Sequence, residues 1–222
     1  INGSPVAMPW VDEVPAILEC WYPGMEGGNA IARTLFGDCN PSGKLPVTFP
    51  ARLADSPAHA SSRTFPGDGE TVHYDEELLV GYRHFDRETI EPLFPFGHGL
   101  SYTSFEYSQL AIEQAGWQQG GALRLSMKLT NTGSCDGAEV VQLYVGPRAA
   151  SLPRPVKELK AFRKVFLRAG ETRSVEFALP ARALAYFCPE SLCWRVDDGD
   201  YEISLGSSSR DLRLRAAVSY AA

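Results

Sequence analysis

The hydrophobic pattern of the first fifty residues alternates between strand-like and helix-like periods. Residues 16–22 are apolar apart from one glutamate, which is typical of a strand covered on both faces in a parallel sheet. Residues 29–36 carry apolar side chains four positions apart and are followed by Gly37, which predicts a helix with a glycine stop. In residues 44–49 every second side chain is apolar, which predicts another strand. Strand, helix and strand in this order predict a right-handed crossover in an α/β layer.

The next stretch predicts a long loop and a further strand. Residues 51–70 are rich in Ala, Ser, Asp, Pro and Gly and show no period, as in loops that are functional or mobile. Residues 78–85 place alternate side chains on one side, and we interpret them as a strand.

From residue 107 onward the pattern changes to short alternating runs. These runs are residues 123–129, 140–145, 164–167, 174–179 and 201–205. Turn-forming residues separate them at 131–133, 169–171 and 197–200. Seven or so short strands at this spacing indicate a β-sandwich, with Trp194 as a core or inter-sheet aromatic.

Composition narrows the class of protein. A chain of 222 residues with 44% hydrophobic and 22% charged residues is an ordinary globular protein, of one large or two small domains. A formal net charge of -6 argues against nucleic acid or anionic lipid as a partner. No apolar run is long enough to span a bilayer, so no membrane partner is expected.

Five sequence blocks carry a family resemblance, in the same order as in the family. They are Gly-Ser-Pro-Val at 3–6, Trp-Tyr-Pro-Gly-x-Glu-Gly-Gly-Asn-Ala at 21–30, Leu-Phe-Gly-Asp-x-Asn-Pro-Ser-Gly-Lys-Leu-Pro-Val-Thr-Phe-Pro at 35–50, Pro-Phe-Gly-His-Gly-Leu-Ser-Tyr-Thr-x-Phe at 95–105, and Arg-Pro-Val-Lys-Glu-Leu-Lys-x-Phe at 154–162. Together they resemble the C-terminal portion of a glycoside hydrolase family 3 enzyme, most like a β-glucosidase.

The resemblance implies an α/β plus all-β fold class. Residues 1–100 are expected to form the C-terminal half of the family's α/β (αβα) sandwich with its connecting loops. Residues 101–222 are expected to form a fibronectin type III-like β-sandwich. The chain begins mid-domain, so an N-terminal barrel and the first half of the sandwich are the expected missing partners.

The resemblance also implies the activity of the parent enzyme. That activity is the retaining hydrolysis of terminal, non-reducing β-D-glucosyl residues of a glucoside or oligosaccharide, with no metal or organic cofactor. A β-xylosidase of the same family is an alternative, and a homo-oligomer stays open. A further alternative is a non-catalytic carbohydrate-binding or scaffolding module, for which Trp117 in the polar run 116–120 is the candidate exposed platform. Burial of Trp117 on its own domain is the competing interpretation.

No catalytic residue can be assigned to this chain. Retaining hydrolysis needs two carboxyl groups about 5–5.5 Å apart. In the resembled family the nucleophile is an Asp of the barrel, in a Ser-Asp-Trp type motif that is absent here. The acid/base is a Glu that precedes the Gly-x-Pro-Val block and therefore falls before Ile1. The chain alone is predicted to be inactive.

The candidate substrate-binding residues are His73, Tyr74 and Asp75, at the end of a long polar loop. Tyr74 would stack on a sugar ring, and His73 or Asp75 would bond hydroxyl groups. The alternative is a run of solvated loop charges. Glu26 is interpreted as a charge at a helix N-terminus, and His84 and His98 as packing residues.

The cysteine count bears on the compartment. Five Cys leave at least one thiol unpaired, which favours a reducing compartment, and we predict a cytoplasmic protein, with periplasmic or secreted locations open. Cys188 and Cys193 flank a hairpin-like turn and are hypothesised to form a disulfide.

Overall fold

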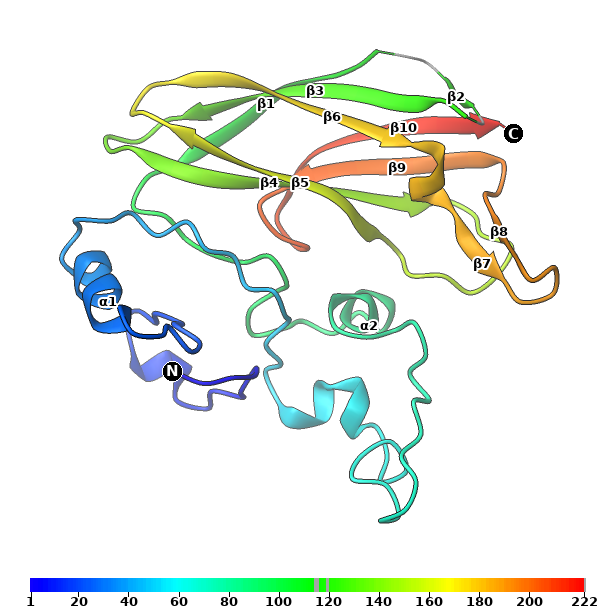
Figure 1. Ribbon diagram of the computed structural model, residues 1–222, viewed down its shortest axis with the longest axis horizontal. Helices are drawn as coiled ribbons and strands as arrows, with labels where there is room; N and C mark the ends of the chain where they lie inside the picture. Colours follow the sequence, from blue (N-terminus) through cyan, green and yellow to red (C-terminus); the bar gives the residue numbers. More distant parts are fainter. Residues whose placement is uncertain (114–115, 119, 222) are drawn as a thin grey trace. The chain divides into compact units, whose positions relative to one another are not determined.

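The chain forms two compact units (Figure 1). The computed structural model describes residues 1–113, 116–118 and 120–221. Unit 1, Ile1–Leu100, is built from short helices and loops, and unit 2, Ser101–Ala222, is built almost wholly from strands. Among the described residues, no helix combines the length and the apolar character needed to cross a bilayer.

Unit 1 confirms the helix expected after the first apolar run. Its elements are η1 Val11–Glu13, α1 Gly27–Leu35, η2 Leu53–Asp55, η3 Pro57–His59 and α2 Tyr82–Arg87. Helix α1 starts two residues earlier than predicted and ends before Gly37, whose φ of 85° is a conformation that glycine adopts without steric cost.

Two predicted strands of unit 1 are wrong as regular strands. Residues 16–22 are assigned to no strand, and Trp21 has a φ of 49°, which interrupts any extended run. Residues 44–49 run beside residues 93–98 but form only the isolated bridge between Phe49 and Phe94. A strand exists only where a neighbour accepts and donates its backbone hydrogen bonds, and the described part of unit 1 supplies no sheet for these segments.

The predicted strand at residues 78–85 is also wrong, because its second half is helical. Gly81 precedes α2 with a φ of 54°, and the N–H of His84 bonds the Gly81 carbonyl at 3.0 Å. The helical turn puts Tyr82 and Phe85 three positions apart on one face. Phe85 is buried, and Tyr82 stacks on Phe96 with ring centroids 4.9 Å apart.

Unit 1 buries few apolar side chains. Met8, Phe49 and Phe85 are the buried hydrophobic residues of residues 1–100. By contrast, Met25 is 99% exposed and Phe36, at the end of α1, is 85% exposed. Unit 1 therefore has little hydrophobic core of its own.

Unit 2 contains all five predicted strands within longer ones. Its strands are β1 Phe105–Ile112, β2 Gly116–Gln118, β3 Ala122–Asn131, β4 Gly137–Pro147, β5 Glu158–Leu167, β6 Thr172–Pro180, β7 Tyr186–Cys188, β8 Cys193–Arg195, β9 Gly199–Gly206 and β10 Leu212–Ala221, with η4 Ala181–Leu184 between β6 and β7. The predicted turns at 131–133 and 169–171 connect β3 to β4 and β5 to β6.

The strands form a two-layered β-sandwich. One sheet has the order β1-β3-β6 and the other the order β2-β10-β9-β4-β5, while β7 and β8 form a separate two-stranded hairpin. Neighbours pair antiparallel except β2 and β10, which are parallel. The register places Leu125 opposite Phe177 in one sheet and Leu143 opposite Leu205 in the other.

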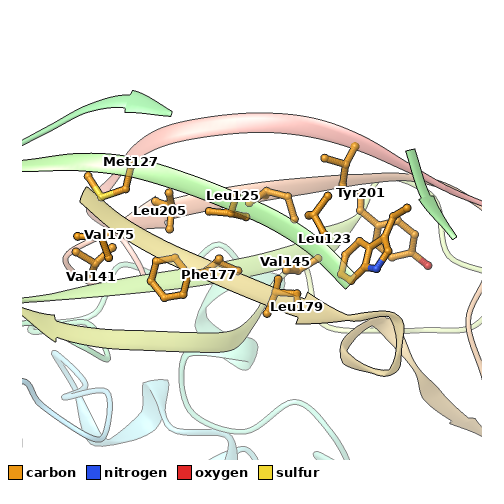
Figure 2. Packing of buried hydrophobic residues seen from close by; sticks show 14 of the residues in the cluster. Leu123, Leu125, Met127, Val141, Val145, Val175, Phe177, Leu179, Tyr201 and Leu205 are labelled. Carbon is orange, nitrogen blue, oxygen red and sulfur yellow. The ribbon is translucent and has the colours of Figure 1, made fainter. Parts of the chain in front are cut away.

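The hydrophobic core lies between these two sheets (Figure 2). Alternate side chains of β3, including Leu123, Leu125 and Met127, point inward and are at most 1% exposed. They pack with residues of β4, β6 and β9, among them Val141, Phe177 and Leu205. The alternation of apolar and polar residues in the sequence thus places apolar side chains on the face of the strand that points into the core.

The two tryptophans of unit 2 lie in different environments. Trp117 is 1% exposed and lies in β2 opposite Tyr220, and the centroids of the two rings are 6.4 Å apart. Trp117 is therefore not an exposed platform. Gln119, in the same polar run, lies outside the described residues. Trp194 is 55% exposed, so its assignment to the core is wrong, because the β7–β8 hairpin belongs to neither sheet of the sandwich.

Asp197, which follows the β7–β8 hairpin, forms hydrogen bonds with Tyr186 of β7 and with Ser151, between β4 and β5. Its Oδ1 accepts a hydrogen bond from the Tyr186 hydroxyl at 2.8 Å, and its Oδ2 accepts one from the Ser151 hydroxyl at 2.9 Å. Partial burial alone would raise the pKa of Asp197, but the hydrogen bonds from Tyr186 and Ser151 together outweigh burial and lower the pKa. The ionised carboxylate therefore stabilises the folded state.

We expect Asp197→Asn to lower the free energy of unfolding by about 1–2 kcal/mol near neutral pH. Because the folded-state pKa is lowered, the carboxylate stabilises above the unfolded-state pKa of about 4, and this contribution is lost as the pH falls through the folded-state pKa. Urea unfolding at about pH 7 and about pH 3 should show the two proteins converging in acid. The exposed control Glu106→Gln should change little, and a deficit of Asp197→Asn that is constant with pH would contradict the prediction.

Candidate functional site

The loop of residues 51–77 in unit 1 is folded on itself by local hydrogen bonds. At its start, Arg52 N–H donates to Asp55 Oδ2 at 3.0 Å, and the Arg52 guanidinium donates to Oδ1 at 2.7 Å. The hydrogen bond from Arg52 is the main reason why the pKa of Asp55 is lowered. These bonds close the turn of η2 at the start of the loop.

The middle of the loop is held by Thr64 and Asp68. Thr64 is 7% exposed, and its Oγ1 lies 2.9 Å from the carbonyl oxygen of Ala58 and 2.8 Å from that of Ser61. Asp68 Oδ1 accepts the backbone N–H groups of Glu70 at 2.9 Å and Thr71 at 2.7 Å, which lowers the pKa of Asp68. The loop is therefore ordered by its own polar groups, as a compact functional loop is.

Arg63 brings His73 and Asp75 together. Its Nε lies 3.1 Å from Asp75 Oδ2, its guanidinium nitrogen lies 3.2 Å from His73 Nδ1, and its carbonyl oxygen accepts the His73 N–H at 3.2 Å. A guanidinium only donates, so His73 Nδ1 accepts and the ring proton is assigned to Nε2. His73 therefore carries an N–H donor on its other side.

The three predicted residues are consecutive, and Arg63 contacts two of them. Tyr74 lies between His73 and Asp75 in the chain and is 78% exposed, and the Asp75 side chain is 50% exposed. The group offers an N–H donor, a carboxylate acceptor and an aromatic ring within three consecutive residues. Sugar hydroxyls need donors and acceptors, and the C–H face of a sugar ring packs on an aromatic face.

Arg63 is the residue that the sequence interpretation missed. A basic residue ten positions before the His-Tyr-Asp run, inside the same loop, is the available signal. That signal is weak, because solvated arginines are common in loops and only the folded loop places Arg63 against both partners.

The other candidates have structural roles. Glu26 is the N-cap residue of α1 and accepts a hydrogen bond from the Asn29 side chain, which confirms its place at a helix N-terminus. His98 stacks on Phe94 at 5.4 Å, and His84 contacts Phe85 at 5.7 Å, which confirms both as packing residues. Among the described residues, no cluster of three or more His, Cys, Asp or Glu side chains is arranged to hold a metal ion. A surface hollow in unit 2, lined partly by Arg124, contains none of the predicted site residues.

Two family profiles match the chain. The glycosyl hydrolase family 3 C-terminal domain matches residues 1–102, and the fibronectin type III-like domain matches residues 139–209. Residues 1–102 therefore belong to the C-terminal domain of glycoside hydrolase family 3. The matches confirm the predicted fold class, a partial α/β sandwich followed by a fibronectin type III-like β-sandwich, although unit 1 lacks the regular strands expected of it.

Relatives within family 3 match almost the whole chain. A thermostable β-glucosidase B from Acetivibrio thermocellus is 47% identical over 98% of the chain, and a β-glucosidase from Bacteroides ovatus is 42% identical over 99% of it. Among solved structures, a β-glucosidase from Bifidobacterium adolescentis superposes with a TM-score of 0.92 at 40% identity over 99% of the chain. A β-glucosidase from Streptomyces venezuelae, solved with D-glucose, superposes with a TM-score of 0.91 at 40% identity over 97% of the chain.

The family 3 relatives are much longer than this chain. The chain covers 28% of the A. thermocellus protein and 30% of the B. ovatus protein. It covers 32% and 27% of the two solved structures. The residues described here thus correspond to less than a third of these family members.

Proposed function

We propose that this chain is the C-terminal part of a retaining β-glucosidase that hydrolyses terminal, non-reducing β-D-glucosyl residues. The observation that carries the proposal is the 47% identity to a β-glucosidase over 98% of the chain. The relatives reported above are all named β-glucosidases, which favours a glucoside over a xyloside substrate.

Within the parent enzyme we assign the two units separate places. Residues 1–100 are the C-terminal half of the α/β sandwich domain, and residues 101–222 are the fibronectin type III-like domain. The catalytic carboxylates come from the remaining parts of the parent, the barrel and the first half of the sandwich. This assignment is supported by the family match of residues 1–102 and by the small share of the relatives that the chain covers.

The activity is tested with nitrophenyl β-D-glucoside and nitrophenyl β-D-xyloside, on the full-length parent and on the 222-residue chain. We expect the parent to prefer the glucoside and the chain to hydrolyse neither. Preference for the xyloside would support a β-xylosidase, and turnover by the chain itself would contradict the placement of the catalytic residues.

For the candidate site, we propose that His73, Tyr74 and Asp75 bind the glucoside in the parent enzyme. Tyr74 stacks on a sugar ring, His73 Nε2–H donates to a hydroxyl oxygen, and Asp75 accepts a hydroxyl proton. Arg63 is a positioning residue, because it holds His73 and Asp75 through its guanidinium. Because Arg63 already orders the His73 and Asp75 side chains, substrate binding loses less conformational entropy.

Replacing His73, Tyr74 and Asp75 together by Ala in the parent is expected to raise KM roughly 10- to 100-fold, since a stacking contact and two hydrogen bonds are removed. The matched control replaces Glu70, Thr71 and Val72 by Ala, which leaves the backbone bonds to Asp68 in place. Steady-state kinetics should show the control unchanged. An unaltered KM for the first variant, in an enzyme that does hydrolyse the glucoside, would reject the binding site and leave the overall function intact.

We also propose a cytoplasmic location. All five cysteines are free in the structure, as expected in a reducing compartment. Fractionation of the native host, with the parent enzyme followed by antibody, tests this, and recovery from the culture medium or periplasm would reject it.

A further inference from the structure

The β7–β8 hairpin of unit 2 aligns two cysteines. Cys188 and Cys193 are directly opposite each other in the antiparallel register, so the hypothesis that they face one another across a turn is confirmed. Both thiols are free, and the hypothesised disulfide is not formed in the structure. Opposite residues of an antiparallel pair have Cα atoms about 4.5–5.5 Å apart. That separation lies inside the range of about 4.4–6.8 Å that a disulfide spans.

The two thiols differ in access. Cys193 is exposed, whereas Cys188 is 3% exposed. A peptide-sized oxidant can therefore reach the sulfur of Cys193 and not that of Cys188. The order in which the two sulfurs react follows from this difference.

The turn between the cysteines stabilises a thiolate at the buried position. Ser191 Oγ lies 3.2 Å from Cys193 Sγ. The Ser191 hydroxyl also bonds Cys188, together with the backbone N–H groups of Ser191 and Glu190 and the Arg195 side chain, and these bonds lower the pKa of Cys188. The lowered pKa raises the thiolate fraction of Cys188 near neutral pH, which favours its attack on a neighbouring sulfur within the hairpin.

The pairs next to the cysteines hold the hairpin in register. Phe187 faces Trp194 with ring centroids 5.9 Å apart, and the Arg182 guanidinium lies 4.0 Å from the Trp194 ring centroid. Tyr186 faces Arg195 and bonds Asp197. These contacts keep Cys188 and Cys193 opposite each other in the hairpin.

We propose that Cys188 and Cys193 are a thiol-modification site that reacts with a low-molecular-weight disulfide such as oxidised glutathione. The Cys193 thiolate attacks one sulfur of the oxidant, forming a mixed disulfide and releasing one glutathione thiolate. The Cys188 thiolate then attacks Cys193 Sγ, which forms the Cys188–Cys193 bond and releases the second glutathione thiolate. Two protein thiols are oxidised, one glutathione disulfide is reduced to two thiols, and the protons of the cysteines pass to water or to the released thiolates. This inference is independent of the glucosidase activity.

The test treats the 222-residue chain with oxidised glutathione, blocks the remaining thiols with iodoacetamide after denaturation, and maps the peptides by mass spectrometry without reduction. Trypsin cleavage after Arg182 and Arg195 leaves both cysteines in one peptide, residues 183–195. We expect this peptide to lose the mass of two hydrogens and to take up no iodoacetamide. Two alkylated cysteines in this peptide after oxidant treatment would overturn the proposal.

Single variants test the order of the two steps. In Cys188→Ser the glutathione adduct should remain on Cys193, and in Cys193→Ser the Cys188 thiol should remain unmodified until it is denatured and alkylated. If Cys188→Ser folds poorly, Cys188→Ala replaces it. The exposed Cys39 is the internal control, which should carry a lasting glutathione adduct without forming a bridge. An adduct on Cys188 in the Cys193→Ser variant, or none on Cys193 in the Cys188 variant, would overturn the assigned order.

Discussion

Replacing Asn131 by Asp is expected to lower the free energy of unfolding of unit 2 by about 3–5 kcal/mol near neutral pH. Asn131 is fully buried at the end of β3. Its Oδ1 accepts hydrogen bonds from the Thr103 hydroxyl at 2.6 Å and from Gly133 N–H at 3.1 Å. Its Nδ2 donates to the carbonyl oxygens of Cys135 at 2.9 Å and Leu167 at 3.2 Å. The side-chain amide is thus satisfied on both sides.

Aspartate has nearly the same shape but only acceptors when ionised. Its second oxygen would face the Cys135 and Leu167 carbonyl oxygens, which would lose their donor and be repelled by a buried negative charge. Burial raises the pKa of such a carboxyl group, so the destabilisation is largest above the folded-state pKa and is partly relieved as the pH falls and the group becomes protonated.

Urea unfolding of the wild type and Asn131→Asp at about pH 7 and about pH 4 measures both effects. Thr132→Ala is the matched control, because Thr132 is the next residue in the same turn and its exposed hydroxyl makes one hydrogen bond, to Ser104. The control should cost about 1 kcal/mol or less. Equal midpoints for wild type and Asn131→Asp at the higher pH would show that the amide network does not hold this end of the sandwich.

The turn at residues 131–133 shows what the sequence can predict. Its Asn-Thr-Gly composition marks a turn, and the structure has one there. The hydrogen bonds of Asn131 reach Thr103 and Leu167, which lie 28 and 36 positions away in the chain. Such partners depend on the assembled sandwich, so local composition does not reveal them.

Strands β3 and β6 of unit 2 were predictable because buried side chains alternate with more exposed ones along them. Strand β10 also alternates, because Leu212 and Leu214 are each followed by an arginine, Arg213 and Arg215, so its sequence carries the same signal. In unit 1 the same kind of pattern failed at residues 78–85. The apolar residues of a segment of only eight residues can fit either the period of a strand or that of a helix. Gly81 is the N-cap residue of α2, but this role is visible only in the backbone conformation.

The sequence could predict which residue types occur at the candidate site, but not how their side chains are arranged. His73, Tyr74 and Asp75 are consecutive, so their proximity is given by the chain. The positions of the His73 and Asp75 side chains depend on Arg63, which the folded loop places in contact with both. Periodicity carries no information about such loop contacts, because they follow from individual hydrogen bonds.

Separated chains of the two units are expected to differ in whether they fold. A chain of residues 101–222 should unfold cooperatively, with a free energy of unfolding of about 5–15 kcal/mol. Its core between the two sheets is formed by side chains of its own strands, of which Leu123, Leu143 and Ile203 are 0% exposed. A chain of residues 1–100 should show no cooperative transition, because it buries little apolar surface against the entropy of ordering its loops.

Urea titrations followed by near-ultraviolet circular dichroism, together with binding of a hydrophobic dye, distinguish the two outcomes. The residues 1–100 chain should bind the dye through apolar side chains such as Met25, Phe36 and Tyr22, which are 99%, 85% and 78% exposed. The control is Phe36→Ser in that chain, which should lower dye binding. A cooperative transition of residues 1–100 would contradict the prediction. Its absence would mean that this unit depends on further protein surface, which in the proposed parent enzyme is the first half of the α/β sandwich.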